Sequence, residues 1–170
     1  MAAEKFATTI QMPMLSKDER GTTYRLPLID LSEHEGEHPY LFCSVNPKKG
    51  TLRGFHMQEA PHEETKLISC LSGSIFLAVF DPGASYSDRK RLETFVLEDQ
   101  TGASATVGPG LATAWLTLTK GCVVLYQILG EFSPTGATGF RFDDPLIGVD
   151  WPLKPRVLAQ KDLSWPLLNS

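Results

Sequence analysis

The sequence predicts an all-β fold, a sandwich or barrel of short antiparallel strands, and two observations support this prediction. Short apolar or alternating segments are separated by turn residues at intervals of roughly eight to twelve residues, the spacing typical of such folds. The chain has 14 glycines and 12 prolines among its 170 residues, and they supply these breaks. No long segment repeats its apolar residues with the helical period, so we expect few helices.

The clearest predicted strands lie in the middle of the chain. Residues 67–71 and 75–80 are mostly apolar, and the intervening residues 72–74 favour a tight turn, so this stretch is predicted as strand, turn, strand. Alternation or β-branched residues predict three further strands, at residues 91–97, 103–107 and 122–129.

The length and composition fit one domain, and we expect it to span residues 1–170. A chain of 170 residues of which 42% are hydrophobic can bury a substantial core. The formal net charge of -4 argues against a general nucleic-acid binder and against a binder of anionic membranes. Any phosphate in a ligand must then be met by a few placed Arg or Lys side chains.

The cysteines and the N-terminus favour a cytoplasmic protein. Cys43, Cys70 and Cys122 form an odd set without paired spacing in apolar surroundings, which is typical of reduced core thiols. The first residues lack a basic segment leading into an apolar stretch, and no segment has the roughly 18 to 20 apolar residues of a membrane span. We therefore expect neither export nor membrane insertion.

The segment of residues 50–58, together with Lys66, gathers groups that suit an anionic substrate with a carbonyl. Arg53 is a fixed cation, His56 accepts a proton near neutral pH, Gln58 carries an amide and Lys66 is a second cation. The two glycines of the segment let the backbone come close to a ligand.

We expect no metal and no cofactor. Metal-dependent enzymes of this fold class bring two or three His and a carboxylate together, usually from a His-x-His start, and the surroundings of His56 and His62 lack this pattern. Residues 31–39 are acidic and His-rich, but no compact ligand set surrounds them. A solvated loop is therefore the better interpretation of that stretch.

Segments spread over most of the chain match one family in their order and spacing. They are residues 18–21, 50–58, 66–67, 107–110, 126, 143–152 and 161–162. These segments resemble the dTDP-4-dehydrorhamnose 3,5-epimerase family. The resemblance implies a cupin-type antiparallel jelly roll, with short helical or irregular segments at its C-terminal end, that acts on nucleotide-linked 4-keto-6-deoxy sugars. It also implies a homodimer in which N-terminal strands cross between subunits, and a place in deoxysugar biosynthesis such as that of O-antigen or another polysaccharide.

The implied reaction needs a base, a cation and an acid. Epimerising a carbon beside a ketone removes its proton, holds the resulting enolate and returns a proton to the other face. His56 is the natural base, Lys66 supplies a cation for the oxyanion on O4, and Tyr126 fits the acid because a phenol keeps its proton at neutral pH. The resemblance makes Asp162 the carboxylate that orients His56. A core role for Tyr126 and a capping role for Asp162 are the alternatives.

Further residues are expected to bind the substrate. Arg53 is the expected phosphate contact, and Arg20 is a second candidate. One guanidinium can bind two phosphate oxygens at once. Gln58 is expected to form a hydrogen bond in the pocket.

The departures from the family fall in the binding shell. Thr113 stands where the family has a His. A hydroxyl can form hydrogen bonds but cannot carry the positive charge of a protonated His. Arg25 replaces a usual Glu, Glu64 replaces a Gln, and Leu41 with Phe42 replaces an amide-rich pair. Because the base, the cation and the acid are kept, these changes indicate an altered sugar or nucleotide and the same reaction.

The sequence therefore predicts an epimerase of a nucleotide-linked 4-keto-6-deoxy sugar that acts at C3, at C5 or at both. A reshaped wall at Thr113 and Trp115 would favour inversion of one carbon. Three alternatives stay open: a nucleotide-sugar-binding cupin without activity, a 3,4-ketoisomerase of a similar substrate, and a metal-dependent cupin.

Overall fold

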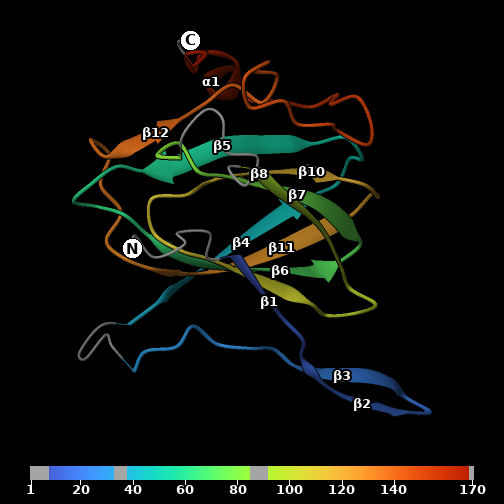
Figure 1. Ribbon diagram of the computed structural model, residues 1–170. Coiled ribbons are helices and arrows are strands. Elements are labelled where there is room, and N and C mark those ends of the chain that lie inside the picture. Colours follow the sequence, from blue (N-terminus) through green and yellow to red (C-terminus); the bar gives the residue numbers. More distant parts are fainter. Residues whose placement is uncertain (1–7, 33–37, 85–91, 169–170) are drawn as a thin grey trace.

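The structure, a computed structural model, describes residues 8–32, 38–84 and 92–168, and in this part of the chain two five-stranded antiparallel sheets face each other (Figure 1). The first sheet consists, in spatial order, of β1 (Thr8–Gln11), β9 (Ser104–Val107), β6 (Thr65–Ser72), β11 (Cys122–Leu129) and β4 (Tyr40–Asn46). The second sheet consists of β12 (Ala137–Gly139), β5 (Leu52–Gln58), β10 (Ala112–Thr117), β7 (Ser74–Phe80) and β8 (Leu92–Glu98). The remaining elements are the hairpin of β2 (Met14–Asp18) with β3 (Gly21–Arg25), and α1 (Gln160–Leu163). The predicted all-β jelly roll is confirmed.

The strands predicted in the middle of the chain are confirmed as β6, β7, β8, β9 and β11. A tight turn between two strands usually makes a hairpin, but β6 and β7 do not pair with each other. Strand β6 lies between β9 and β11 in the first sheet, whereas β7 lies between β10 and β8 in the second. The chain thus crosses from one sheet to the other at Gly73, whose φ of +77° favours glycine.

The core between the two sheets is built from the inward side chains of facing strands. Ile68 of β6, Leu77 and Val79 of β7, Trp115 of β10 and Val124 of β11 belong to one buried cluster. Each such side chain contributes roughly 1.5 to 3 kcal/mol through removal of its apolar surface from water. Because both sheets direct apolar side chains into this layer, the strands are predicted well from short apolar runs.

The chain after β12 covers the outer face of the second sheet (Figure 1). Trp151 of this segment packs against Phe55 of β5, with ring centroids 6.5 Å apart. Asp144 ties the segment together, because its carboxylate accepts the backbone N–H of Leu146 at 2.7 Å and that of Leu168 at 2.6 Å. Within this outer layer, α1 lies beside β5.

Two regions of the fold leave large side chains exposed. The hairpin of β2 and β3 projects beyond the two sheets, and its residues are mostly exposed (Figure 1). Strand β4 is an edge strand of the first sheet and exposes Leu41, Phe42 and Val45. An exposed apolar edge strand is typical of a surface that another chain covers.

The cysteine prediction is correct in part. All three cysteines are free, and Cys70 and Cys122 are buried. Cys43, however, is exposed, because it lies on the edge strand β4 and not in the core. Among the helices of the described residues, none has the length and apolar composition to cross a membrane.

Candidate active site

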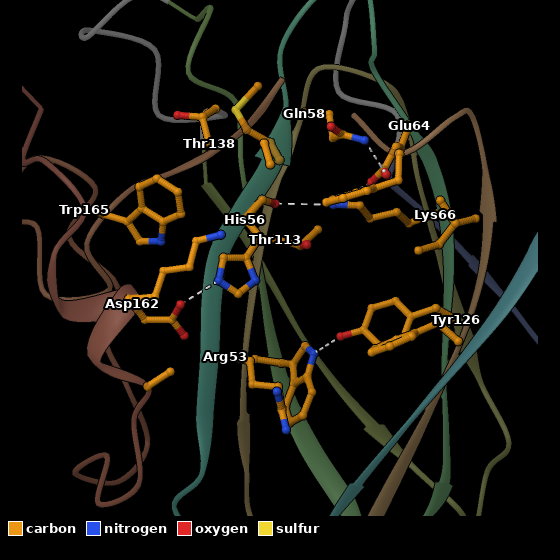
Figure 2. Close-up of a pocket in the computed structure, with 18 of the residues that line it drawn as sticks. Arg53, His56, Gln58, Glu64, Lys66, Thr113, Tyr126, Thr138, Asp162 and Trp165 are labelled. Atoms are coloured by element: carbon orange, nitrogen blue, oxygen red, sulfur yellow. Dashed lines mark hydrogen bonds and ion pairs between the residues drawn. The ribbon is translucent and has the colours of Figure 1, made fainter. Parts of the chain in front are cut away.

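A cavity of about 600 Å³ lies between the two sheets (Figure 2). Strands β5, β10 and β12 of the second sheet form one wall, and β4, β6 and β11 of the first sheet form the other. Residues 159–165 contribute a further side through α1 and the turn after it. The volume is in the range of small-molecule sites.

Strand register places Lys66 and Tyr126 on the inner face of the first sheet. Tyr126 of β11 lies opposite Ile68 of β6, and Ile128 of β11 lies opposite Lys66. Residues that lie directly opposite, and residues two apart in one strand, share a face of the sheet. All four side chains therefore point the same way, and Lys66 and Tyr126 line the cavity.

Strand β5 needs an irregularity to present both Arg53 and His56 to the cavity. These residues are three positions apart, so regular alternation would place them on opposite faces. The register against β10 shifts between them, since His56 lies opposite Thr113 and Arg53 lies opposite Trp115. The bulge contains Gly54, whose φ is +121° and whose added Cβ would lie 2.5 Å from a backbone atom of β10. Such a bulge redirects side chains, and here it brings both residues to one site.

The carboxylate of Asp162 binds two groups of β5, and Figure 2 shows the bond to one of them, His56. One oxygen lies 2.7 Å from His56 Nε2, and the other accepts the backbone N–H of Gly54 at 3.3 Å. Because an ionised carboxylate only accepts, Nε2 donates and Nδ1 remains as the acceptor. Burial alone would raise the pKa of Asp162, but these hydrogen bonds and the charges of His56 and Arg53 hold it below its ordinary value. The His56 side chain is 45% exposed and that of Asp162 only 4%, so water reaches the imidazole.

Lys66 belongs to a buried polar cluster. Its ammonium lies 3.6 Å from one oxygen of Glu64 and donates to the backbone carbonyl of His56 at 3.3 Å. The other Glu64 oxygen accepts from Gln58 Nε2 at 2.8 Å and from the Tyr40 hydroxyl at 3.4 Å. Burial lowers the pKa of Lys66, and the negative charge of Glu64 opposes this shift. Glu64 thus favours the charged form of a lysine that has little contact with water.

Tyr126 faces the cavity from the side opposite His56 (Figure 2). Its hydroxyl accepts a hydrogen bond from Trp115 Nε1, and the Arg53 guanidinium lies 5.9 Å from the centroid of the Trp115 ring. Burial raises the pKa of Tyr126 to about 12, although the Trp115 hydrogen bond and the Arg53 charge act to lower it. The phenol therefore keeps its proton at neutral pH.

The cavity brings together most of the residues predicted to bind substrate. Those that line it are Arg53, Gln58, Glu64 and Thr113. Arg20 and Arg25 do not line it, since both lie on the hairpin that projects beyond the sheets. The Arg20 side chain is 84% exposed and pairs with Asp18. Within one chain, the predicted contact of these two arginines with the cavity is therefore not formed.

Sequence reasoning missed Lys161, Trp165 and Thr138 as cavity residues. Trp165 packs edge to face against the His56 ring at 6.5 Å between centroids, and Lys161 Nζ lies 5.2 Å from the Trp165 centroid. The signal for Lys161 was its position next to Asp162 in the family resemblance. The sequence around Thr138 carries no signal of this kind, because β12 has only three residues.

No metal centre is visible in residues 8–32, 38–84 and 92–168, where no three His, Cys, Asp or Glu side chains are grouped to hold an ion. Residues 33–37 of the acidic, His-rich stretch lie outside the described residues. The interpretation of that stretch as a solvated loop therefore stays a prediction.

The two walls of the cavity carry complementary proton chemistry. His56 offers a proton acceptor on one side, and Tyr126 offers a proton on the other. The Lys66 ammonium lies at the same cavity and can stabilise a negative charge on oxygen. Together these groups can remove a proton from a bound carbon acid, hold the resulting anion and return a proton.

Comparisons with known proteins identify similar sequences and folds. The dTDP-4-dehydrorhamnose 3,5-epimerase of Sinorhizobium fredii is 32% identical over 126 residues, which are 74% of this chain and 65% of that protein. The enzyme of the same name from Mycobacterium tuberculosis is 34% identical over 111 residues, which are 65% of this chain and 54% of that protein. The chain thus spans less than two thirds of the length of these curated relatives.

The fold comparison covers almost the whole chain. A crystal structure of dTDP-4-dehydrorhamnose 3,5-epimerase from Bacillus anthracis, with TDP and PPi bound, has a TM-score of 0.85 at 25% identity. The likeness covers 95% of this chain and 94% of that chain. The family model described as dTDP-4-dehydrorhamnose 3,5-epimerase matches residues 7–170. The chain therefore belongs to the dTDP-4-dehydrorhamnose 3,5-epimerase family.

Proposed function

We propose that the protein is an epimerase of a nucleotide-linked 4-keto-6-deoxy sugar. The observation that supports this most strongly is the placement of the His56–Asp162 pair and the protonated Tyr126 on opposite sides of one cavity. Inversion of a carbon beside a ketone requires a proton acceptor on one face and a proton donor on the other. A single cavity that holds both, with an ammonium nearby, meets this requirement.

In the proposed reaction, His56 Nδ1 takes the proton from the carbon beside the ketone. The electron pair of the broken C–H bond moves into the enolate, and the negative charge on O4 is stabilised by the Lys66 ammonium. Asp162 stabilises the imidazolium that forms. Tyr126 then gives its proton to the opposite face of the carbon while the ketone is restored, and water re-establishes the starting protonation of His56 and Tyr126.

The diphosphate group of the nucleotide-linked sugar is proposed to bind at Arg53. The relative from Bacillus anthracis was crystallised with TDP and PPi, which are anionic ligands of that protein. In this chain Arg53 is exposed, lines the cavity and is held by a hydrogen bond to Asn46 at 3.2 Å. A guanidinium placed in this way can bind two phosphate oxygens at once.

A homodimer is proposed to complete the binding site. Phe42 of the exposed edge strand β4 also lines the cavity, so this edge borders the site. A projecting hairpin from a second copy, laid along β4, would bring Arg20 and Arg25 to the rim of the cavity. Sedimentation equilibrium tests this assembly. The wild type is expected to be a dimer, and Phe42→Asp is expected to shift it toward monomer.

Inversion of one carbon is proposed over inversion of two. Thr113 lies opposite His56 in the register of β10 and β5 and is buried. Its hydroxyl forms hydrogen bonds but carries no charge, so position 113 lacks the cation that the family resemblance implies there. We therefore expect weaker stabilisation of a second enolate.

Deuterated water tests the proposed function. The protein is incubated with dTDP-linked and with CDP-linked 4-keto-6-deoxy sugars, and mass spectrometry with NMR locates deuterium and configuration at C3 and C5. We expect deuterium with inversion at one carbon of at least one sugar. Absence of exchange with every sugar would contradict the proposal and favour binding without turnover, the alternative that Thr113 supports. Transfer of the carbonyl from C4 to C3 would favour a 3,4-ketoisomerase.

The setting of this activity is proposed from the same features. We propose that residues 1–170 form one jelly-roll unit that works in the cytoplasm, in deoxysugar biosynthesis for a surface polysaccharide such as O-antigen. The three free cysteines are consistent with a reducing compartment.

A further inference from the structure

The hydrogen bond between Trp115 and Tyr126 has a direction that chemistry fixes. An indole N–H donates and has no acceptor function, so the Tyr126 oxygen must be the acceptor of this bond. The phenolic proton of Tyr126 must therefore point elsewhere. In the described ranges, the Tyr126 hydroxyl has no other hydrogen-bond partner, and the residue lines the cavity.

The position of Trp115 leaves the indole little freedom. Trp115 lies on β10 opposite Arg53 of β5 and Leu77 of β7, and its side chain is 1% exposed. The Arg53 guanidinium lies 5.9 Å from the ring centroid, on the cavity side of the sheet. A side chain packed in this way holds its N–H in one direction, and the Tyr126 hydroxyl accepts the hydrogen bond.

We propose that Trp115 is a positioning residue for Tyr126: its Nε1–H fixes the phenol as a donor toward the substrate carbon and stabilises the phenolate that remains after proton delivery. This inference rests on the proposed function. In the step concerned, the O–H bond of Tyr126 breaks, a C–H bond forms on the enolate carbon, and the electron pair of the O–H bond stays on the Tyr126 oxygen. Trp115 and Arg53 both act to lower the pKa of Tyr126 against the effect of burial, which is the direction that favours this phenolate.

A structural role alone would give Trp115 a different signature. A buried indole N–H needs some acceptor, and Tyr126 serves that need whatever the reaction is. Loss of the bond would then weaken folding or binding, and all steps of the reaction would slow together. The proposed role instead affects proton delivery by Tyr126 and leaves proton removal by His56 intact.

The rates of exchange and inversion of the Trp115→Phe variant, measured in deuterated water, distinguish these two roles. Because His56 is half-exposed, deuterium from solvent reaches its imidazole, and return of deuterium to the same face gives exchange without inversion. We expect inversion to slow by roughly tenfold to a hundredfold, the effect of one lost hydrogen bond to a developing charge. Exchange without inversion is expected to continue within about threefold of the wild-type exchange rate.

Trp151→Phe is the matched control. Trp151 is partly buried, and its Nε1 donates to the backbone carbonyl of Phe142 at 2.9 Å, outside the cavity. This variant also loses one indole hydrogen bond, but the ratio of inversion to exchange is expected to match the wild type. A change in that ratio as large as that of Trp115→Phe would overturn the inference.

Two further measurements keep the inference testable if Trp115→Phe folds poorly. Benzothienylalanine at position 115 keeps the bicyclic shape and removes only the N–H, and it is expected to give the same loss of inversion. In a Tyr126→Phe background, Trp115→Phe is expected to cause no further loss of inversion beyond about twofold, because both changes act on one step.

The outcomes distinguish this inference from the proposed function. A wild type that neither exchanges nor inverts any of the sugars would overturn the proposed function, and the inference with it. A wild type that inverts, while the Trp115 variants invert equally fast or lose exchange and inversion in parallel, would overturn the inference alone.

Discussion

The two walls of the cavity differ in how far water reaches the proposed base on one and the proposed cation on the other. On the wall formed by β5 and the C-terminal segment, the His56 side chain is 45% exposed. On the wall formed by β6 and β11, the Lys66 side chain is 9% exposed and burial raises the pKa of Tyr126 to about 12. A proposed base must pass its proton to water after each turnover, whereas a cation that stabilises an oxyanion acts more strongly away from water. We name these the exposed wall and the buried wall.

The two walls also depend on different kinds of structure. On the buried wall, Lys66 and Tyr126 are aligned by the regular register of two neighbouring strands. On the exposed wall, His56 depends on a bulge at Gly54 and on Asp162, which is 106 positions away along the chain. The buried wall is therefore set by local sheet geometry, and the exposed wall by a contact between distant segments.

The largest expected effect is that of removing the proposed base from the exposed wall. His56→Asn is expected to reduce both exchange and inversion by about a thousandfold, since a positioned general base typically contributes 10²- to 10⁴-fold. Initial rates of deuterium incorporation measure this loss. His62→Asn, which changes a histidine outside the cavity, is expected to keep the wild-type rates. Equal rates for His56→Asn and the wild type would mean that the base lies elsewhere.

Removing the proposed acid from the buried wall is expected to affect only one of the two proton transfers. Tyr126→Phe should slow inversion by about a hundredfold while exchange without inversion continues, because the enolate still forms. The ratio of inverted to exchanged product measures this effect. Tyr40→Phe removes another cavity hydroxyl whose pKa burial raises to about 12, and it should leave the ratio unchanged. If exchange also stopped in Tyr126→Phe, the assignment of separate roles to the two walls would be wrong.

A smaller effect is expected from Glu64→Gln, and it depends on pH. The charge of Glu64 raises the pKa of Lys66 against the larger lowering caused by burial. Without that charge the pKa of Lys66 falls further, so the ammonium loses its proton at a lower pH and the alkaline limb of the rate profile shifts to lower pH. Near neutral pH the rate should change by about threefold or less.

The pH dependence of kcat/KM for inversion measures the Glu64 effect. Glu63→Gln is the matched control, because Glu63 is exposed and lies outside the cavity. Its profile should coincide with that of the wild type. An alkaline limb in Glu64→Gln that stays in place, or that moves to higher pH, would contradict the proposed role of Glu64.

The smallest expected effect concerns stability on the exposed wall. The pKa of Asp162 is lower in the folded chain than its ordinary value, so on acidification the unfolded chain takes up the proton first. The contribution of Asp162 to stability is therefore complete above its unfolded pKa and is lost as the pH falls through its folded pKa. Asp162→Asn should remove this part of the acid dependence.

Thermal unfolding between neutral and acidic pH measures the Asp162 effect. The expected difference between wild type and variant at neutral pH is a few degrees, since about 1 kcal/mol shifts the unfolding temperature of a chain of this size by roughly 2 to 4 °C. The variant for comparison is Asp143→Asn. It changes an exposed aspartate that lies outside the cavity and pairs with Arg141. The stability difference between wild type and Asp162→Asn should shrink on acidification, and a difference that grows would contradict the lowered pKa of Asp162.

The buried wall was largely predictable from sequence, and the exposed wall was not. Strands β6 and β11 are short apolar runs, and period-two alternation within them shows which side chains share a face. The same rule fails in β5, where strict alternation from Arg53 would turn His56 away from the cavity. The shift follows from the bulge at Gly54, whose place depends on close contact with β10.

Contacts between distant segments escaped sequence reasoning for a related reason. Nothing in the local pattern around Asp162 indicates His56 as its partner, and only the family resemblance brought the two together. The crossing of the chain between sheets at Gly73 was also missed, because a tight turn has the same local signals whether its strands pair or separate. The positions of Arg20 and Arg25 depend on where the hairpin projects, which strand patterns do not show.

The layer outside the second sheet supplies one side of the cavity and the partner of His56. Without residues 159–165, His56 would lack its carboxylate. Asp144 links two parts of this outer layer, because its carboxylate accepts the backbone N–H groups of Leu146 and Leu168. These hydrogen bonds support the segment that carries Asp162, although Asp144 does not line the cavity. The proposed base therefore depends on a layer outside the two sheets, and a change that displaces this layer would remove the carboxylate of His56 while leaving in place the strands that carry Lys66 and Tyr126.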